Sequence, residues 1–126
     1  FSEFFRDYGM LEDAHLALRA GRKWKLLEYG AARCTHLRTP GGRFNQRRWA
    51  QKTAVNFRFV FMDIVPRRTW KQEMRFWSIQ VFDLFRLTTL ALRKPGKGNW
   101  LLPVGKIEGI LAAARLKTEP AHTARQ

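Results

Sequence analysis

With 126 residues, of which 45% are hydrophobic, the chain is long enough for one domain with a buried core and too apolar to be disordered throughout. Its formal net charge of +14 comes from 24 Lys and Arg against 10 Asp and Glu, which favours an anionic partner: nucleic acid, anionic lipid or a phosphorylated small molecule. A single cysteine, Cys34, excludes an internal disulfide and a cysteine-based metal cage. Because the chain opens on Phe1 in an apolar cluster, we expect a fragment that lacks its N-terminal part.

An irregular lead-in over residues 1–10 is expected to precede a helix over residues 11–21. Residues that can share its inner face recur at helical spacing: Leu11, His15 and Leu18. Glu12 and Asp13 at its start suit the positive end of the helix dipole. Gly21 is typical of a helix C-terminus, so both ends of this helix are predicted.

The segment after this helix favours strands. Trp24–Leu27 and Ala31–His36 are predicted to form a short strand pair, joined by a turn over residues 28–30. The run of Thr, Pro and two Gly over residues 39–42 predicts a loop after the second strand.

Helical periodicity dominates from Gln46 onward. One helix is predicted from Gln46 to Pro66, a second from Pro66 to Lys94, and a weaker third, rich in small side chains, over residues 105–116. The apolar stripe predicted for the first of these helices comprises Trp49, Thr53, Asn56, Phe57, Val60, Phe61 and Ile64. The stripe predicted for the second comprises Trp70, Met74, Trp77, Val81, Leu84, Phe85, Thr88 and Leu92.

The second of these helices carries charges along its whole length. The charged residues are Lys71, Glu73, Arg75, Asp83 and Arg86. A membrane-spanning helix needs about 20 predominantly apolar residues, so this helix is not expected to span a bilayer. Its aromatic stripe and basic edge would suit a helix that lies on a membrane surface. Aromatic stripes at helical spacing are more often part of a core, so we expect this one to pack against the rest of the protein.

One constellation near the start of the chain points to a family. It comprises Phe1, Glu3, Phe5, Tyr8, Glu12, Asp13, Leu16, Arg19, Gly21 and Ala32 to His36. This pattern resembles the acceptor-side half of family 2 glycosyltransferases, which are inverting enzymes with the GT-A fold. The resemblance implies an α/β fragment: a strand pair and a helix from the C-terminal half of a GT-A domain, followed by two or three amphipathic helices. Residues 1–45 would belong to the catalytic domain, residues 46–117 to a C-terminal helical region, and residues 118–126 to a frayed tail.

The same resemblance implies roles for three residues. Asp13 would be the general base that takes the proton of the acceptor hydroxyl, and Glu12 would orient the site or bind acceptor hydroxyls. His36 would be a ligand of the divalent metal, Mn²⁺ or Mg²⁺, at the donor diphosphate. Without the family context, the acid pair would be a capping and dipole pair and His36 a structural histidine at a strand end.

Three further residues are candidate binding groups. Arg38 and Arg43 flank the predicted loop and could neutralise a leaving diphosphate, although an ordinary basic surface loop fits the pattern equally well. Trp24 could stack on a sugar, but we expect it to pack in the sheet.

The chain departs from the family pattern, because it contains no D-x-D motif for the metal and no N-terminal nucleotide-binding half. We therefore expect this chain alone to be inactive. The resemblance implies a nucleotide-diphospho-sugar donor and a carbohydrate or lipid-linked acceptor, in the synthesis of cell-surface polysaccharide or glycolipid. It also implies a cytoplasmic location, with peripheral contact at the inner face of the cytoplasmic membrane.

The alternative is a small basic protein that binds nucleic acid or an anionic membrane without catalysis. The net charge and the interleaving of bases with aromatics, as in Arg75-Phe76-Trp77, support it. No zinc-finger spacing or RNA-recognition motif accompanies that charge, so nucleic acid is the less expected partner. A D-x-D motif upstream of Phe1 would favour the transferase.

Overall fold

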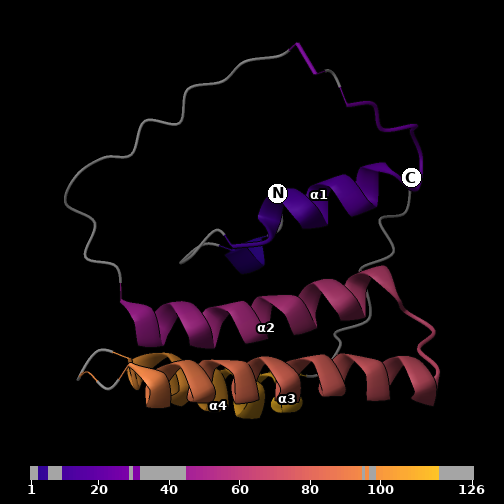
Figure 1. The fold of residues 1–126 in the computed structure, drawn as a ribbon. Helices are drawn as coiled ribbons and strands as arrows, with labels where there is room; N and C mark the ends of the chain where they lie inside the picture. The colour runs from indigo at the N-terminus through magenta and orange to yellow at the C-terminus, as the bar shows by residue number, and fades with distance from the viewer. Residues whose placement is uncertain are drawn as a thin grey trace.

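The structure, a computed structural model, describes residues 3–5, 10–28, 30–31, 45–94, 96 and 99–116. These residues form a short 3-10 helix and four α-helices (Figure 1). In chain order the elements are η1 (Glu3–Phe5), α1 (Glu12–Ala20), α2 (Gln46–Ile64), α3 (Trp70–Arg93) and α4 (Leu101–Arg115). The described part of the chain is all-α and contains no strand.

The predicted α/β class is therefore wrong. Trp24–Leu27, the first predicted strand, has irregular backbone, and Trp24 and Leu27 are 67% and 81% exposed. A strand is stabilised by cross-strand pairs and by a covered face, and the described residues offer this segment neither. Of the second predicted strand only Ala31 is described, in a turn. The rest of that strand and the predicted loop over residues 39–42 lie outside the described residues.

The ends of α2 and α3 follow from their capping residues. The side chain of Asn45 accepts a hydrogen bond of 2.9 Å from a backbone N–H in the first turn of α2, and α2 ends before Pro66 as predicted. The helix predicted from Pro66 to Lys94 is α3. It begins later than predicted, at Trp70, because Thr69 and Gln72 form a capping box. The predicted helix over residues 11–21 is confirmed as α1.

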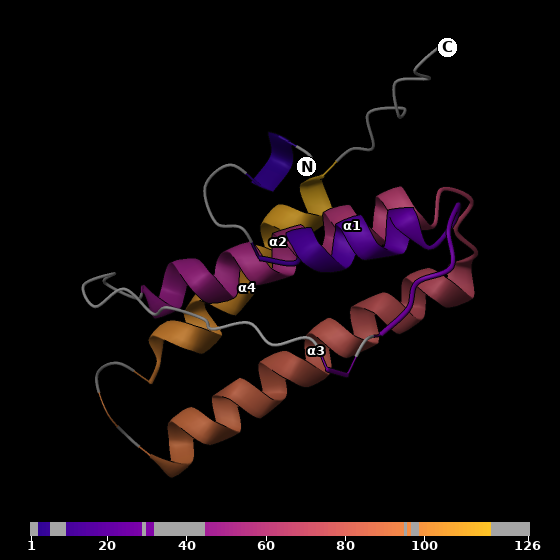
Figure 2. The same ribbon diagram turned by 90° about the horizontal axis from the view of Figure 1, so that it is seen from above.

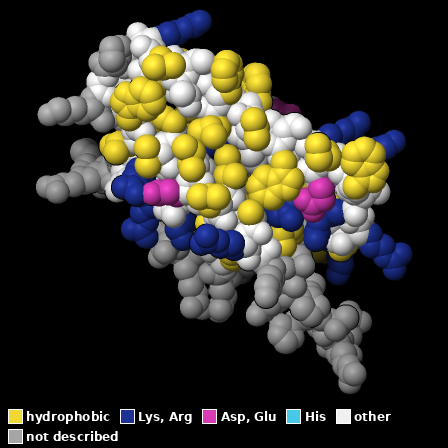
Figure 3. Space-filling model, turned by 90° about the horizontal axis from the view of Figure 1, so that it is seen from below, with side chains coloured by type: hydrophobic (Ala, Val, Ile, Leu, Met, Phe, Trp, Pro, Cys, Tyr) yellow, Lys and Arg dark blue, Asp and Glu magenta, His cyan; other side chains and the backbone are white. Residues whose placement is uncertain are grey.

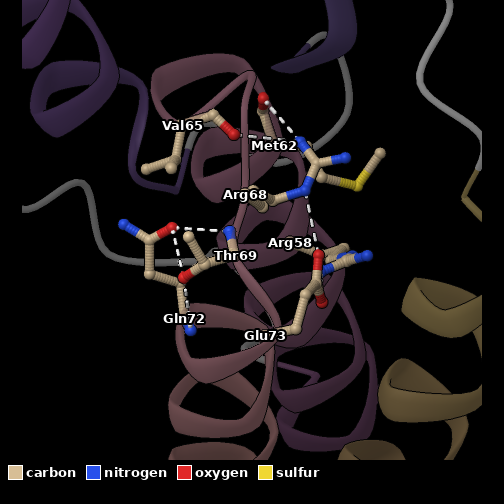
Figure 4. A network of polar contacts seen from close by, with 7 residues as sticks. All are labelled: Arg58, Met62, Val65, Arg68, Thr69, Gln72 and Glu73. Atoms are coloured by element: carbon tan, nitrogen blue, oxygen red, sulfur yellow. Dashed lines mark hydrogen bonds and ion pairs between the residues drawn. The ribbon is translucent and has the colours of Figure 1, made fainter.

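A charged cluster fastens the turn between α2 and α3 (Figure 4). Glu73 accepts hydrogen bonds from Arg58 Nη1 at 2.7 Å and from Arg68 Nε at 2.9 Å. Arg68 Nη1 also donates to the carbonyls of Met62 and Val65, both at 3.1 Å. Met62 lies in the last turn of α2 and Val65 directly follows the helix, so Arg68 both caps the end of α2 and positions the start of α3.

Aromatic rings continue the contact between α2 and α3. The rings of Phe61 and Phe76 stack with their centroids 4.9 Å apart, and Phe76 meets Trp77 edge to face. The guanidinium of Arg58 lies 5.2 to 5.7 Å from the centroids of all three rings. Cation–π attraction therefore adds to the ion pair of Arg58 with Glu73.

Small residues allow α4 to pack closely on α2, which lies between α1 and α4 (Figures 1 and 2). Ala50 and Ala54 of α2 are buried, as are Gly105, Gly109 and Ala113 of α4. A Cβ atom at Gly105 would collide with the backbone of α2, and one at Gly109 would lie 2.9 Å from the Cβ of Ala54. The spacing of four between the small residues keeps them on one face of each helix.

Five of the eight residues of the stripe predicted to pack on α3 face outward, whereas Trp77, Leu84 and Thr88 are half-buried. We define the outer stripe as the following five residues: Trp70, Met74, Val81, Phe85 and Leu92. Each of them is 57% to 72% exposed, whereas the buried residues of α3 are Phe76, Gln80, Leu87 and Ala91. The prediction failed because α3 is apolar on two faces, and the face that packs includes a glutamine that pairs with a buried lysine of α4. Among the described helices, none is both long and apolar enough to cross a bilayer.

Candidate functional site

The acid pair predicted as a site occupies the first turn of α1. Glu12 is half-buried and Asp13 is exposed. No hydrogen bond or ion pair joins Asp13 to another described residue, and α1 has no side-chain cap hydrogen bond. The carboxylate of Asp13 is therefore not used to cap α1 and is open to a substrate from solvent.

The backbone that leads into the pair is strained. Leu11, immediately before Glu12, has φ 68°, and it is the only non-glycine residue with positive φ among the described residues. A left-handed conformation costs an ordinary L-residue about 1–2 kcal/mol. Such strain persists only where neighbouring contacts impose it, and it is often found at functional sites.

Polar contacts hold α1 and the residues on either side of it on α2. Asn56, which is 2% exposed, donates from Nδ2 to the backbone carbonyl of Met10 at 2.9 Å. His15 Nε2 lies 2.9 Å from Asp63 Oδ2 at the other end of α2. Arg22, which lies just beyond the end of α1, donates to the carbonyl of Ile64, the last residue of α2. The start, middle and end of α1 are thus each held on α2, so the position of Asp13 is fixed.

His15 belongs to an aromatic cluster under α1. Its ring centroid lies 5.5 Å from that of Phe5 and 5.4 Å from that of Phe59. The rings of Phe4 and Phe59 stack at 3.9 Å. His15 is buried and hydrogen-bonded to Asp63, so it anchors α1 and is closed to a substrate. Sequence analysis placed His15 on the inner face but gave no sign of its partner, which lies 48 residues further along the chain.

The other predicted site residues are not brought together by the described structure. Trp24 is exposed beyond the end of α1 and does not pack in a sheet, so its indole is available for stacking. His36, Arg38 and Arg43 lie outside the described residues. No group of three or more His, Cys, Asp or Glu side chains among the described residues could hold a metal ion. The described residues thus do not fit the implied Mn²⁺ or Mg²⁺, and we derive no step through it.

An apolar groove is a feature that the sequence did not reveal. It has a volume of about 340 Å³, lies between α2 and α3, and is also lined by Leu18 of α1. Its walls include Phe57, Val60, Phe76 and Ile79, and its few polar lining residues are Gln72, Arg75 and Gln80. The lining combines residues of α1, α2 and α3, so the groove exists only once these helices have come together.

Comparison of the chain with protein-family models, with curated proteins and with solved structures found no match in any of the three.

Proposed function

We propose that this chain is the acceptor-side part of an inverting, family 2-like glycosyltransferase in which Asp13 is the general base. The observation that carries the proposal is the exposed carboxylate of Asp13 at the start of a helix whose entry is strained and fixed on α2. The resemblance of the surrounding residues to that family supplies the reaction, and the helix supplies a defined position for the base.

In this reaction Asp13 accepts the proton of an acceptor hydroxyl as the hydroxyl oxygen attacks the anomeric carbon of the donor. A new C–O bond forms on one face of the sugar, the bond to the nucleoside diphosphate breaks on the other, and the diphosphate leaves. Glu12, half-buried beside Asp13, binds or orients the acceptor. The exposed indole of Trp24 offers a stacking surface for a sugar ring.

The proposal is tested by the rate of nucleoside-diphosphate release from a panel of UDP-, GDP- and dTDP-sugars by the intact protein. Asp13→Asn keeps the size of the side chain but removes the base, so we expect turnover to fall by at least about 100-fold. Binding of the nucleoside diphosphate, measured by titration calorimetry, should change little. Glu28→Gln, at another exposed acidic residue of the described part, is the matched control and should retain full turnover.

Two outcomes would contradict the proposal. One is an intact protein that releases no nucleoside diphosphate from any sugar donor of the panel when membrane-lipid extract is supplied as acceptor. The other is Asp13→Asn turnover that equals that of the Glu28→Gln control.

A further inference from the structure

The outer stripe of α3 leaves an unusual amount of apolar surface uncovered. Its five residues recur at intervals of four and seven, so they share one face over the full length of the helix. Three large hydrophobic residues of α4 are exposed as well: Val104, Ile107 and Leu111. Figure 3 shows hydrophobic side chains gathered across the face that is seen from below. A helix of 24 residues is about 36 Å long, so the stripe is an extended surface rather than a single contact point.

A row of bases runs beside this stripe. Four of its five residues are followed directly by Lys or Arg, and we define the basic row as these four residues: Lys71, Arg75, Arg86 and Arg93. The next residue along a helix lies about 100° further around the axis, so the basic row borders the outer stripe on one side. All four bases are exposed.

The acids of α3 and α4 pair with only one base of this row, Arg86. Glu73 pairs with Arg58 and Arg68 at the α2–α3 turn, and Glu108 pairs with Arg47. Asp83 pairs with the buried Lys106 as well as with Arg86. Lys71, Arg75 and Arg93 have no ion-pair partner among the described residues.

We propose that this face binds the surface of an anionic lipid bilayer, with the outer stripe in the acyl–headgroup boundary and the basic row on the anionic headgroups. An apolar face with Trp and Phe beside a row of Lys and Arg is the arrangement of helices that lie in a membrane interface. Charge complementarity selects this occupant, because neutral lipid would leave the basic row without a partner. Nucleic acid would contact the bases and leave the stripe in water. A second copy of the chain could cover the stripe but would bring no anionic partner to the basic row.

The test is flotation of the intact protein with vesicles of phosphatidylcholine alone or mixed with phosphatidylglycerol. We expect wild type to float with the mixed vesicles and at least about tenfold less with the neutral ones. The double variant Val81→Glu, Phe85→Glu should lose flotation with both. The double variant Arg75→Glu, Arg93→Glu should lose the preference for phosphatidylglycerol. Leu27→Glu, at an exposed leucine outside the helices, is the control and should float as wild type.

Three results would overturn the proposal: no flotation of wild type with phosphatidylglycerol, equal flotation of the Val81→Glu, Phe85→Glu variant, or a dimer that this variant dissociates without any vesicle binding. The altered side chains are all exposed, and circular dichroism would confirm that the helices are retained. Asp13→Asn should float as wild type, so a failed sugar-transfer proposal and a failed bilayer proposal are distinguishable.

Discussion

Lys106 is the residue whose environment is furthest from what its type predicts. It is 3% exposed, and its ammonium lies 2.8 Å from Gln80 Oε1 and 2.8 Å from Asp83 Oδ2. Asp83 also accepts hydrogen bonds from Arg86, at 2.8 and 3.1 Å. Buried charge is tolerated only when it is paired and hydrogen-bonded, and here both conditions are met. In the sequence Asp83 is one of several charges along a predicted helix, and its pairing with Lys106 is not predictable because it joins α3 to α4.

Replacing Asp83 should destabilise the fold more than replacing Lys106. Asp83→Asn leaves the buried ammonium of Lys106 without its counter-ion and should lower the free energy of unfolding by about 2–3 kcal/mol. Lys106→Met should cost less, because Asp83 keeps Arg86 and reaches solvent. Urea unfolding of both variants measures the difference. Equal costs would show that Asp83 is not the main partner of Lys106.

Two carboxylates predict how stability depends on pH. Burial alone would raise the pKa of Glu73, but hydrogen bonds and charges from Arg58 and Arg68 outweigh burial and hold that pKa below its ordinary value of 4.5. The pKa of Asp83 is likewise held below 3.8: burial opposes the shift, and Lys106 and Arg86 more than compensate. Both groups stabilise the fold fully above those ordinary values and lose this contribution as pH falls through the lower folded values.

Glu73→Gln should therefore make the free energy of unfolding less dependent on pH in the acid range. In wild type the free energy of unfolding should fall between neutral pH and about pH 3, whereas Glu73→Gln should start lower and fall less. Urea unfolding at the two pH values measures this. The control Glu28→Gln should follow wild type. A Glu73→Gln variant that loses as much stability as wild type would contradict the role of the two arginines.

At the scale of elements, the helices were predictable and their packing was not. α1 and α2 lie close to their predicted bounds, because Gly21, Pro66 and the periodic apolar residues mark them locally. The strand over Trp24–Leu27 failed, since β-prone residues need a neighbouring strand that this local pattern cannot supply. The prediction that the outer stripe is part of the core was wrong for the same reason, because the face of α3 that packs is decided by α2 and α4.

The close approach of α4 to α2 predicts that a Gly→Ala substitution at the contact lowers stability, although the same substitution stabilises an isolated helix. In an isolated helix Gly→Ala stabilises by about 1 kcal/mol. At Gly109 the added Cβ would overlap Gln51 and Ala54 of α2, so Gly109→Ala should instead destabilise by about 1–3 kcal/mol. Gly96→Ala is the control and should be tolerated, because a Cβ atom there would lie 3.7 Å from Asn99 Nδ2, an ordinary van der Waals distance. Thermal unfolding of both variants measures this, and a stabilised Gly109→Ala would contradict the packing.

At the scale of the whole molecule, α2 separates two surfaces. α1 packs on one side of α2, and α3 and α4 lie on the other (Figure 1). A bilayer bound at the outer stripe would therefore leave Asp13 open to a water-soluble donor. Of the candidate site, sequence analysis could predict the acid pair, since Glu12 and Asp13 are adjacent in the chain. It could not predict how Asn56 and Asp63 fix that pair, because those contacts join distant segments.

Because the two surfaces are separate, a variant should be able to lose vesicle binding without losing sugar transfer. The variant Val81→Glu, Phe85→Glu should lose vesicle binding and keep the wild-type rate of nucleoside-diphosphate release from a soluble sugar donor. Flotation and release rates measured on the same preparation check this. A variant that loses both activities while its circular dichroism is unchanged would show that the two surfaces are coupled.

The central claim, that Asp13 acts as a base and not as a helix cap, is tested most directly by rescue of Asp13→Ala with formate. The smaller side chain leaves room for an added carboxylate, which can take the proton in place of Asp13. The account predicts that Asp13→Ala releases nucleoside diphosphate at least about 100-fold more slowly than wild type and that formate raises this rate without affecting wild type. An Asp13→Ala rate equal to wild type, or a lost rate that formate leaves unchanged, would contradict it.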